Sequence, residues 1–338
     1  MKSTAVAHPT QSLIRYDWLY RDPDVPSNGN VSVCMENLYT TTTVETSETD
    51  RIFINGEEAD RNDRAFRMLD RFRDMFRLNY PVVVHSENSG PNGIIGYDQA
   101  KGVGFSTSGG ASLVTSLLDL FGLNNILEST EEYTRVMSKL SGSGVKSAVG
   151  GISYWNVING VPDVYVLASR ASIPDFRILC VPISNEIVIP TAEIHRQMER
   201  SPISRLRQEK VRDYLVRVVE YARESDVEGV SYVSQLDSLL FHETLEKGPG
   251  NLSVLSKQSL GISGRMKELR GGYEDPGEVI SHGFIPVYVS WSGGPTTYIN
   301  FRAGYQDEIL RHLDDAEVRK FILSGIGEGC RIIDQHIA

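Results

Sequence analysis

The sequence lacks the features of a secreted, membrane-spanning or nucleic-acid-binding protein. Its three cysteines, Cys34, Cys180 and Cys330, are widely spaced, which argues against a disulfide framework and against a cysteine zinc site. No stretch approaches about eighteen consecutive apolar residues, and the first residues lack the apolar segment of a signal peptide. A net charge of −10 argues against nonspecific nucleic-acid binding. We therefore expect a cytoplasmic protein with three reduced thiols and no membrane or nucleic-acid partner.

The composition is that of an ordinary globular protein. Hydrophobic residues make up 40% of the chain and charged residues 23%, and there is no internal repeat or low-complexity tract. A chain of 338 residues is long enough for two domains. We predict a mixed α/β (α+β) fold in which an N-terminal domain covers residues 1–180 and a C-terminal domain covers residues 181–338.

Hydrophobic periodicity predicts the main elements. β-Branched segments between turn-forming residues favour strands, and residues 1–50 are typical of a β-meander. Apolar residues at helical spacing predict helices, among them one over 203–225. The predicted apolar face of that helix contains Leu206, Val211, Leu215, Val218 and Ala222. The predicted strands are 31–35, 39–46, 51–56, 81–86, 152–158, 164–168, 178–182, 284–288 and 297–301, and the predicted helices are 62–78, 108–121, 131–140, 203–225 and 306–324.

A loop rich in glycine and hydroxyl residues, GVGFSTSGG at 102–110, leads into one of these helices. Backbone N–H groups at a helix start lie at the positive end of the helix dipole, and Ser106, Thr107 and Ser108 add hydroxyl donors. The loop, including Gly104, is therefore a candidate phosphate site. It matches neither GxxxxGK[ST] nor GxGxxG. A tight turn with a capping hydroxyl accounts for these residues equally well.

Several segments together resemble one known family. The stretch VHSEN at 84–88 is followed by GVGFSTSGGA at 102–111, SGSGVKSAVGG at 141–151, DSLLFH at 237–242 and SGGP at 292–295. Their order is similar to that of corresponding motifs in the diphosphomevalonate decarboxylases, which belong to the galacto-, homoserine, mevalonate and phosphomevalonate (GHMP) kinase superfamily. Residues 7–35 resemble the N-terminus of the same enzymes, so the resemblance spans nearly the whole chain. It implies a GHMP-kinase fold with an active-site cleft between two domains.

The resemblance also implies a reaction in which ATP phosphorylates the 3-hydroxyl of a phosphorylated mevalonate before phosphate and CO₂ leave. The positions of the family's Asp, Lys and Arg hold Ser292, Arg15 and Lys146. Ser292 cannot act as a carboxylate base. Arg15 and Lys146 keep the positive charge that departure of a phosphate requires. The sequence therefore predicts a decarboxylase that has lost the phosphorylation step.

A longer loop supports the same prediction. Residues 90–102, GPNGIIGYDQAKG, expand the family's short connection where the nucleotide phosphates should lie. The chain then resembles the mevalonate 3,5-bisphosphate decarboxylases of the Thermoplasma-type archaeal pathway, which need no ATP. The implied substrate is a small phosphorylated mevalonate, the implied product is isopentenyl phosphate, and the implied assembly is a homodimer. No metal site and no cofactor are expected.

The predicted site residues follow from this resemblance. Arg15 and Lys146 would bind the 3-phosphate or the carboxylate. A carboxylate relocated from the position of Ser292 would come from Asp17 or Asp237. The predicted catalytic residues are Arg15, Lys146, Ser292 and Asp17, and the predicted phosphate-binding residues are Gly104, Ser106, Thr107, Ser108 and Ser143.

Two alternatives remain open at this point. The first is an ATP- and Mg²⁺-dependent mevalonate 3-kinase, or a phosphomevalonate or diphosphomevalonate decarboxylase, since archaeal mevalonate 3-kinases also lack the family's Asp. The second is a catalytically silent paralogue that binds an isoprenoid or phosphate ligand. The sequence leaves open whether the substrate carries a monophosphate or a diphosphate at C5.

Overall fold

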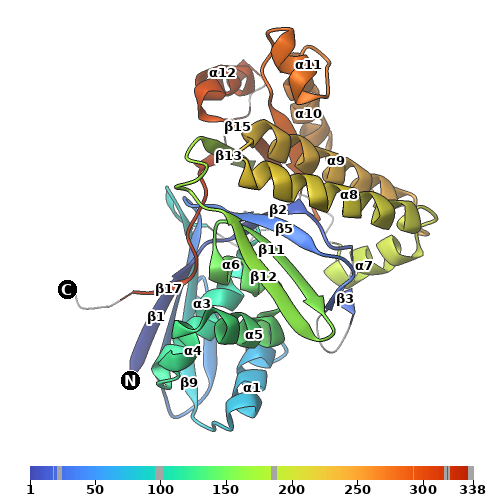
Figure 1. The fold of residues 1–338 in the computed structure, drawn as a ribbon. Coiled ribbons are helices and arrows are strands. Elements are labelled where there is room, and N and C mark those ends of the chain that lie inside the picture. The colour runs from blue at the N-terminus through green and yellow to red at the C-terminus, as the bar shows by residue number, and fades with distance from the viewer. Residues whose placement is uncertain are drawn as a thin grey trace.

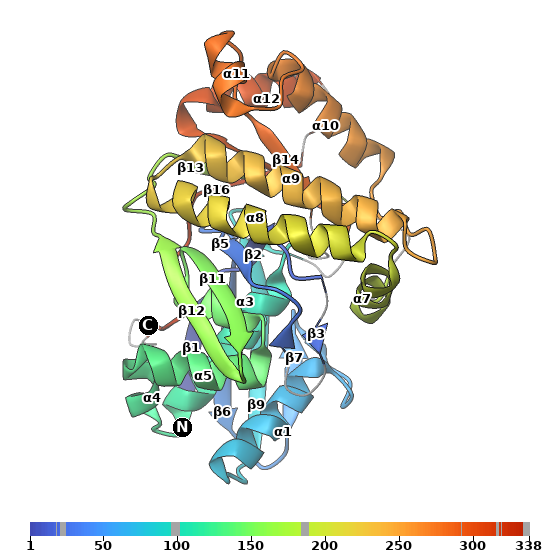
Figure 2. The same ribbon diagram turned by 45° about the vertical axis from the view of Figure 1, so that its right-hand side comes forward.

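The structure is a computed structural model, and it describes residues 1–17, 19–20, 25–95, 102–183, 189–291, 293–315, 318 and 320–333. Strands β1 to β12, the C-terminal strand β17 and helices α1 to α6 form the lower part of Figure 1, and strands β13 to β16 with helices α10 to α12 form the upper part. Helices α8 (Ser204–Arg223) and α9 (Val227–Glu246) run side by side between them (Figures 1 and 2). No helix of the described residues is long and apolar enough to cross a membrane.

The first sheet has the strand order β17-β1-β6-β9-β7-β8, with β10 beside β9. The β7–β9 pair is parallel and the other pairs are antiparallel. Helices α1 and α3 contribute apolar side chains to its core. The elements of this part are β1 (Lys2–Ala7), β6 (Tyr39–Thr46), β7 (Arg51–Ile54), β8 (Glu57–Glu58), β9 (Val82–Gly90), β10 (Gly93–Ile94), β17 (Arg331–Ile332), α1 (Arg64–Phe76), α3 (Phe105–Leu120), α4 (Asn124–Glu128) and α5 (Thr130–Ser141).

The second sheet has the order β12-β11-β5-β2 and is covered on both faces. Val31 and Val33 belong to the apolar cluster that includes Val211 of α8 and Val230 of α9. Cys34, which alternates with them, faces helix α6 and donates a hydrogen bond to the carbonyl of Lys146. The elements are β2 (Thr10–Ile14), β5 (Asn30–Cys34), β11 (Ile152–Ile158), β12 (Val161–Ala168) and α6 (Gly144–Val149), with β3 (Leu19–Tyr20) and β4 (Val25–Pro26) as a separate pair.

The predicted N-terminal meander is wrong. The strands over 30–34 and 39–46 follow each other in sequence but lie in different sheets, because β5 pairs with β2 and β11 while β6 pairs with β1 and β9. All five residues of β5 are buried. A strand buried on both faces needs a neighbour along each edge and helices on both sides, which a hairpin with β6 would not provide.

The third sheet has the order β14-β15-β13-β16 and packs with α10, α12 and the C-terminal loops. Two predictions fail here. The strand expected over 284–288 lies instead over Tyr288–Trp291, and the helix expected over 306–324 ends at Asp315. Residues 322–324 form β16, because they pair with residues 178–180 at the edge of the sheet. The elements are β13 (Phe176–Val181), β14 (Tyr288–Trp291), β15 (Thr297–Arg302), β16 (Ile322–Ser324), α7 (Thr191–Arg200), α10 (Lys257–Leu269), α11 (Pro276–Ser281), η1 (Ala303–Tyr305) and α12 (Gln306–Asp315).

The chain passes between the lower and upper parts more than once. Strand β13 pairs with C-terminal strands, and β17 returns to pair with β1. The division into two domains at residue 180 stays a prediction. The three cysteines are free thiols, as predicted, with Cys34 and Cys180 buried.

Candidate active site

Arg15 lies directly after β2 and is fixed by three hydrogen bonds, one from its backbone and two from its side chain. Its backbone N–H and its Nη1 both donate to Oδ2 of Asp237, at 3.1 and 2.8 Å. Its Nη2 donates to the carbonyl of Trp291 at the end of β14. Only 5% of Arg15 is exposed, and burial lowers the pKa of its guanidinium while Asp237 opposes that shift. Its Nε has no partner among the described residues.

Asp237 joins Arg15 to a second arginine, Arg207 of α8. Nη2 of Arg207 donates to Oδ1 of Asp237 at 3.0 Å, and Nη1 donates to the Asp237 carbonyl at 3.1 Å. Nε of Arg207 donates to Oδ1 of Asp17 at 2.5 Å. Phe241 lies one turn after Asp237 on α9, and its ring faces both guanidinium groups. The ring centroid is 5.8 Å from Cζ of Arg15 and 5.2 Å from Cζ of Arg207. These contacts form a buried network of two arginines and two aspartates.

Burial and pairing set the charge of this network. Burial raises the pKa of Asp17, and Arg207 opposes that shift. Burial also acts on Arg207, but the two carboxylates prevail and its pKa is raised. Because two guanidinium groups face two carboxylates, the network of Arg15, Asp17, Arg207 and Asp237 is neutral overall when all four are ionised.

Lys146 is a buried cation of a different kind. It lies on α6 with 2% of its surface exposed, and its Nζ is 5.6 Å from the centroid of the Tyr16 ring. No carboxylate within the described part of the chain forms an ion pair with it. Burial, with a smaller contribution from the nearby Arg15, lowers the pKa of Lys146 to about 8. An ammonium in this setting gains from an anionic ligand.

The glycine loop turns sharply into α3. Gly104 has a φ of 88°, and a Cβ at this position would lie 2.4 Å from the carbonyl oxygen of Thr10, so only glycine fits. Thr107 donates to the Gly104 carbonyl at 2.7 Å and accepts a bond from Ser147. Ser108 donates to the carbonyl of Phe105 at 3.1 Å and bonds to the Thr40 hydroxyl. Both hydroxyls are therefore engaged inside the fold.

Ser106 differs from its two neighbours because its side chain is exposed at the start of α3. The second glycine–serine segment lies close by. A Cβ on Gly110 of α3 or on Gly144 of α6 would come within 2.0 or 2.2 Å of the Ser141 hydroxyl oxygen, so these helices approach each other closely. Ser143, just before α6, is mostly buried and its side chain caps no backbone N–H.

The structure thus brings Arg15, Asp17 and Asp237 into one network and places Lys146 nearby through Tyr16. Ser292 and residues 96–101 of the expanded loop lie outside the described residues. Arg207 was missed by the sequence prediction, which placed Leu206 on the apolar face of its helix. Leu206 is 47% exposed and Arg207 is wholly buried. The spacing of Val211, Val218 and Ala222 extends back to residue 207 rather than 206, and this was the available signal.

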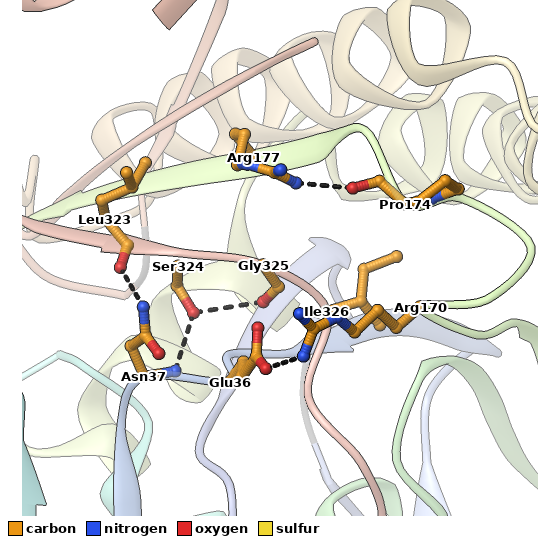
Figure 3. A pocket seen from close by; sticks show the side chains of 9 residues that line it. All are labelled: Glu36, Asn37, Arg170, Pro174, Arg177, Leu323, Ser324, Gly325 and Ile326. Carbon is orange, nitrogen blue, oxygen red and sulfur yellow. Dashed lines mark hydrogen bonds and ion pairs between the residues drawn. The ribbon is translucent and has the colours of Figure 1, made fainter. Parts of the chain in front are cut away.

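A separate cavity of about 160 Å³ lies where the chain crosses between the lower and upper parts (Figure 3). Arg170 reaches Glu36 there, and Arg177 donates to the carbonyl of Pro174 at 2.6 Å. None of the predicted site residues lines it. Its lining residues are Glu36, Asn37, Arg170, Pro174, Arg177, Leu323, Ser324, Gly325 and Ile326.

Comparisons with known proteins match this fold and these motifs. Residues 7–163 match a family model described as the diphosphomevalonate decarboxylase-like N-terminal domain. The chain is 25% identical over 347 residues to the phosphomevalonate decarboxylase of Haloferax volcanii, with 99% of this chain and 98% of that protein covered. Its fold is similar to that of the mevalonate diphosphate decarboxylase of Staphylococcus aureus, with a TM-score of 0.85, 21% identity and 98% of each chain covered.

A kinase is also among the similar structures. The mevalonate-3-kinase of Thermoplasma acidophilum superposes with a TM-score of 0.78 at 18% identity, again over 98% of each chain. The predicted mixed α/β fold is therefore confirmed, and it is similar to the fold of these two enzymes. Residues 7–163 thus match the diphosphomevalonate decarboxylase-like family that the ordered motifs predicted.

Proposed function

We propose that the protein is a mevalonate-pathway decarboxylase that acts on mevalonate 3,5-bisphosphate without ATP. It removes the 3-phosphate and CO₂ and forms isopentenyl phosphate. The relative from Haloferax volcanii is named a phosphomevalonate decarboxylase, and this supports the coarser assignment to decarboxylation of a phosphorylated mevalonate. The finer assignment rests on how the buried charges are paired.

The observation that carries the proposal is that both buried aspartates are neutralised while Lys146 is not. Asp17 pairs with Arg207, and Asp237 pairs with Arg207 and Arg15. The Asp237 carboxylate has both oxygens engaged by guanidinium groups, so it is not available as a base for a substrate hydroxyl. Lys146 has no such pairing with any carboxylate of the described residues, and a buried ammonium suits an anion. This arrangement favours the departure of phosphate over the deprotonation of an alcohol.

The chemistry of the elimination needs no proton transfer from the protein. The bond between the carboxylate carbon and C2 breaks, and its electron pair forms the double bond between C2 and C3. The bond between C3 and the phosphate oxygen breaks, and the phosphate leaves with that electron pair. Negative charge therefore builds up on the leaving oxygen, where a cation such as Lys146 or Arg15 stabilises the transition state.

The remaining predicted residues take supporting roles in this proposal. The exposed Ser106 and the backbone N–H groups at the start of α3 suit a phosphate of the substrate, and Gly104 makes the turn that exposes them. Thr107 and Ser108 shape the loop through their internal hydrogen bonds. Ser143 lies at the start of α6 beside this loop, and Ser292 is assigned no role as a base.

Phosphate and CO₂ release from mevalonate 3,5-bisphosphate, measured with and without ATP and Mg²⁺, tests the proposal. We expect release without ATP. No release, together with ADP formation from mevalonate or its 5-phosphate, would establish the kinase or the ATP-coupled decarboxylase instead. Similarity to a kinase whose structure is described as bound to mevalonate 3-phosphate and ADP is the observation that favours this second candidate.

Three further outcomes complete the assignment. Binding of the bisphosphate without any turnover would favour the catalytically silent paralogue. Whether the substrate carries a monophosphate or a diphosphate at C5 is tested by comparing the turnover of the two 3-phosphorylated compounds. The homodimer implied by the family is tested by sedimentation of the purified chain.

A further inference from the structure

Arg207 contacts no predicted substrate-binding group, yet all three of its guanidinium nitrogens are engaged. Nε donates to Asp17, Nη2 to the carboxylate of Asp237, and Nη1 to the carbonyl of Asp237. The last two bonds fix both the backbone and the side chain of Asp237. The side chain of Arg207 is wholly buried, so no alternative partner from solvent replaces these contacts.

Asp237, held by Arg207, in turn restricts the orientation of Arg15. Its Oδ1 accepts from Arg207, which leaves Oδ2 facing Arg15. Oδ2 then accepts from both the backbone N–H and the guanidinium of Arg15. A carboxylate held at one oxygen cannot rotate, and so the other oxygen gives Arg15 a single orientation.

The charge balance shows why an arginine is needed at position 207, between Asp17 and Asp237. Without Arg207, Arg15 would be the one remaining cation paired with Asp237 among the described residues. Asp17 would be left buried with neutral neighbours, Ser27 and Asn28, whose side chains accept from its backbone N–H. A lysine has one compact ammonium and cannot match a planar guanidinium that bonds two carboxylates at once.

We infer that Arg207 is a positioning residue, which holds Asp237 and Asp17 so that Arg15 is fixed in the orientation that the reaction uses. It touches no reacting group itself. The inference rests on the proposed function, because Arg15 is assigned there to a substrate anion.

The test uses a variant that keeps the charge balanced. Arg207→Met combined with Asp17→Asn removes one cation and one anion, and leaves Arg15 paired with Asp237. We expect this double variant to fold with a melting temperature close to that of the wild type. Its kcat on mevalonate 3,5-bisphosphate should fall about tenfold to a hundredfold, because Arg15 is no longer held in one orientation. Its KM should change by less than about threefold.

Two further variants separate positioning from stability. Arg207→Lys should recover part of the stability lost in Arg207→Met but little of the kcat. Arg302→Met is the matched control, because Arg302 forms a two-bonded ion pair with Glu228 of the same helix α9, at 2.7 Å for both bonds. It should lower the melting temperature and leave kcat unchanged. A double variant with wild-type kcat would overturn the inference and make Arg207 purely structural.

Failure of the proposed function is seen separately, as absence of turnover by the wild type. The crystal structure of the double variant then decides the inference alone. We expect the Asp237 carboxylate to rotate once Oδ1 is released, and the Arg15 guanidinium to leave the carbonyl of Trp291. An unchanged Arg15 would overturn the inference.

Discussion

Two sets of buried cations lie at the candidate active site, and the protein treats them in opposite ways. Arg15 and Arg207 are matched by Asp17 and Asp237. Lys146 has the Tyr16 ring beside it and no carboxylate among the described residues. A buried charge is costly unless it is paired. The matched set therefore neutralises its own charges, and in the proposed function the unmatched lysine binds an anionic group of the substrate.

The largest expected effect comes from breaking the matched set. Asp237→Asn leaves Arg15 without its carboxylate and Arg207 with only Asp17. Removing one partner of a buried ion pair costs about 3–5 kcal/mol of unfolding free energy. Urea denaturation measures this loss.

Glu228 lies on α9, as Asp237 does, and provides a control for the loss of an ion pair on that helix. Glu228→Gln weakens the more exposed pair with Arg302 and should cost about 1 kcal/mol or less. Equal losses for Asp237→Asn and Glu228→Gln would show that the buried network has no special role in stability.

The unmatched lysine should behave in the opposite way. Lys146→Met should lower kcat/KM about a hundredfold to a thousandfold, because a cation facing the leaving phosphate is lost. The melting temperature should stay the same or rise, because an uncompensated buried charge is removed. Steady-state kinetics and thermal unfolding of the same preparation check both effects. A large loss of stability with normal turnover would contradict the comparison.

The smallest expected effect is a pH dependence of the wild type. The folded pKa of Lys146 is lowered to about 8 from the ordinary 10.5, so above pH 8 the folded state binds fewer protons than the unfolded state. Burying the charged Lys146 ammonium lowers the unfolding free energy, and this cost is fully present below pH 8. The unfolding free energy therefore rises as the pH increases above 8 and Lys146 loses its proton. Over the same range kcat/KM should fall, because neutral Lys146 no longer attracts an anion.

The contribution of Lys146 is read as the difference between the wild type and Lys146→Met. Burial raises the pKa of the Cys34 thiol to about 12, so that group titrates differently in the folded and unfolded states above its ordinary value of 9.0. Measurements between pH 7 and 9 avoid most of its effect. An identical pH dependence in the two proteins would exclude Lys146 as its source.

Local elements of the fold were predictable because their signals are short in range. The helix at Arg64–Phe76 and the strands at Tyr39–Thr46 and Thr297–Arg302 follow from periodicity and β-branched residues alone. Strand β5 was predicted correctly in type but was assigned to the wrong sheet. Periodicity identifies the buried faces of a strand and not the strand beside it.

The site was predictable in part, and the resemblance to a family was decisive. It predicted Arg15 and Lys146 as site residues, although their neighbours in sequence show no distinctive local pattern. Asp17 and Asp237 were considered as possible bases, but their partners could not be foreseen. Arg207 was hidden in an otherwise amphipathic helix, where an arginine is usually solvated.

The sequence by itself predicted most of the local elements and the motifs that resemble a family, because each of these signals is a short segment whose residues lie close together in the chain. Only the tertiary structure decided which charges are paired. Arg15 and Asp237 are 222 positions apart, and Arg207 is 190 positions from Asp17. Their pairing requires β2, α8 and α9 to pack and exclude water, and the same burial leaves Lys146 as a cation without a carboxylate partner in the described structure.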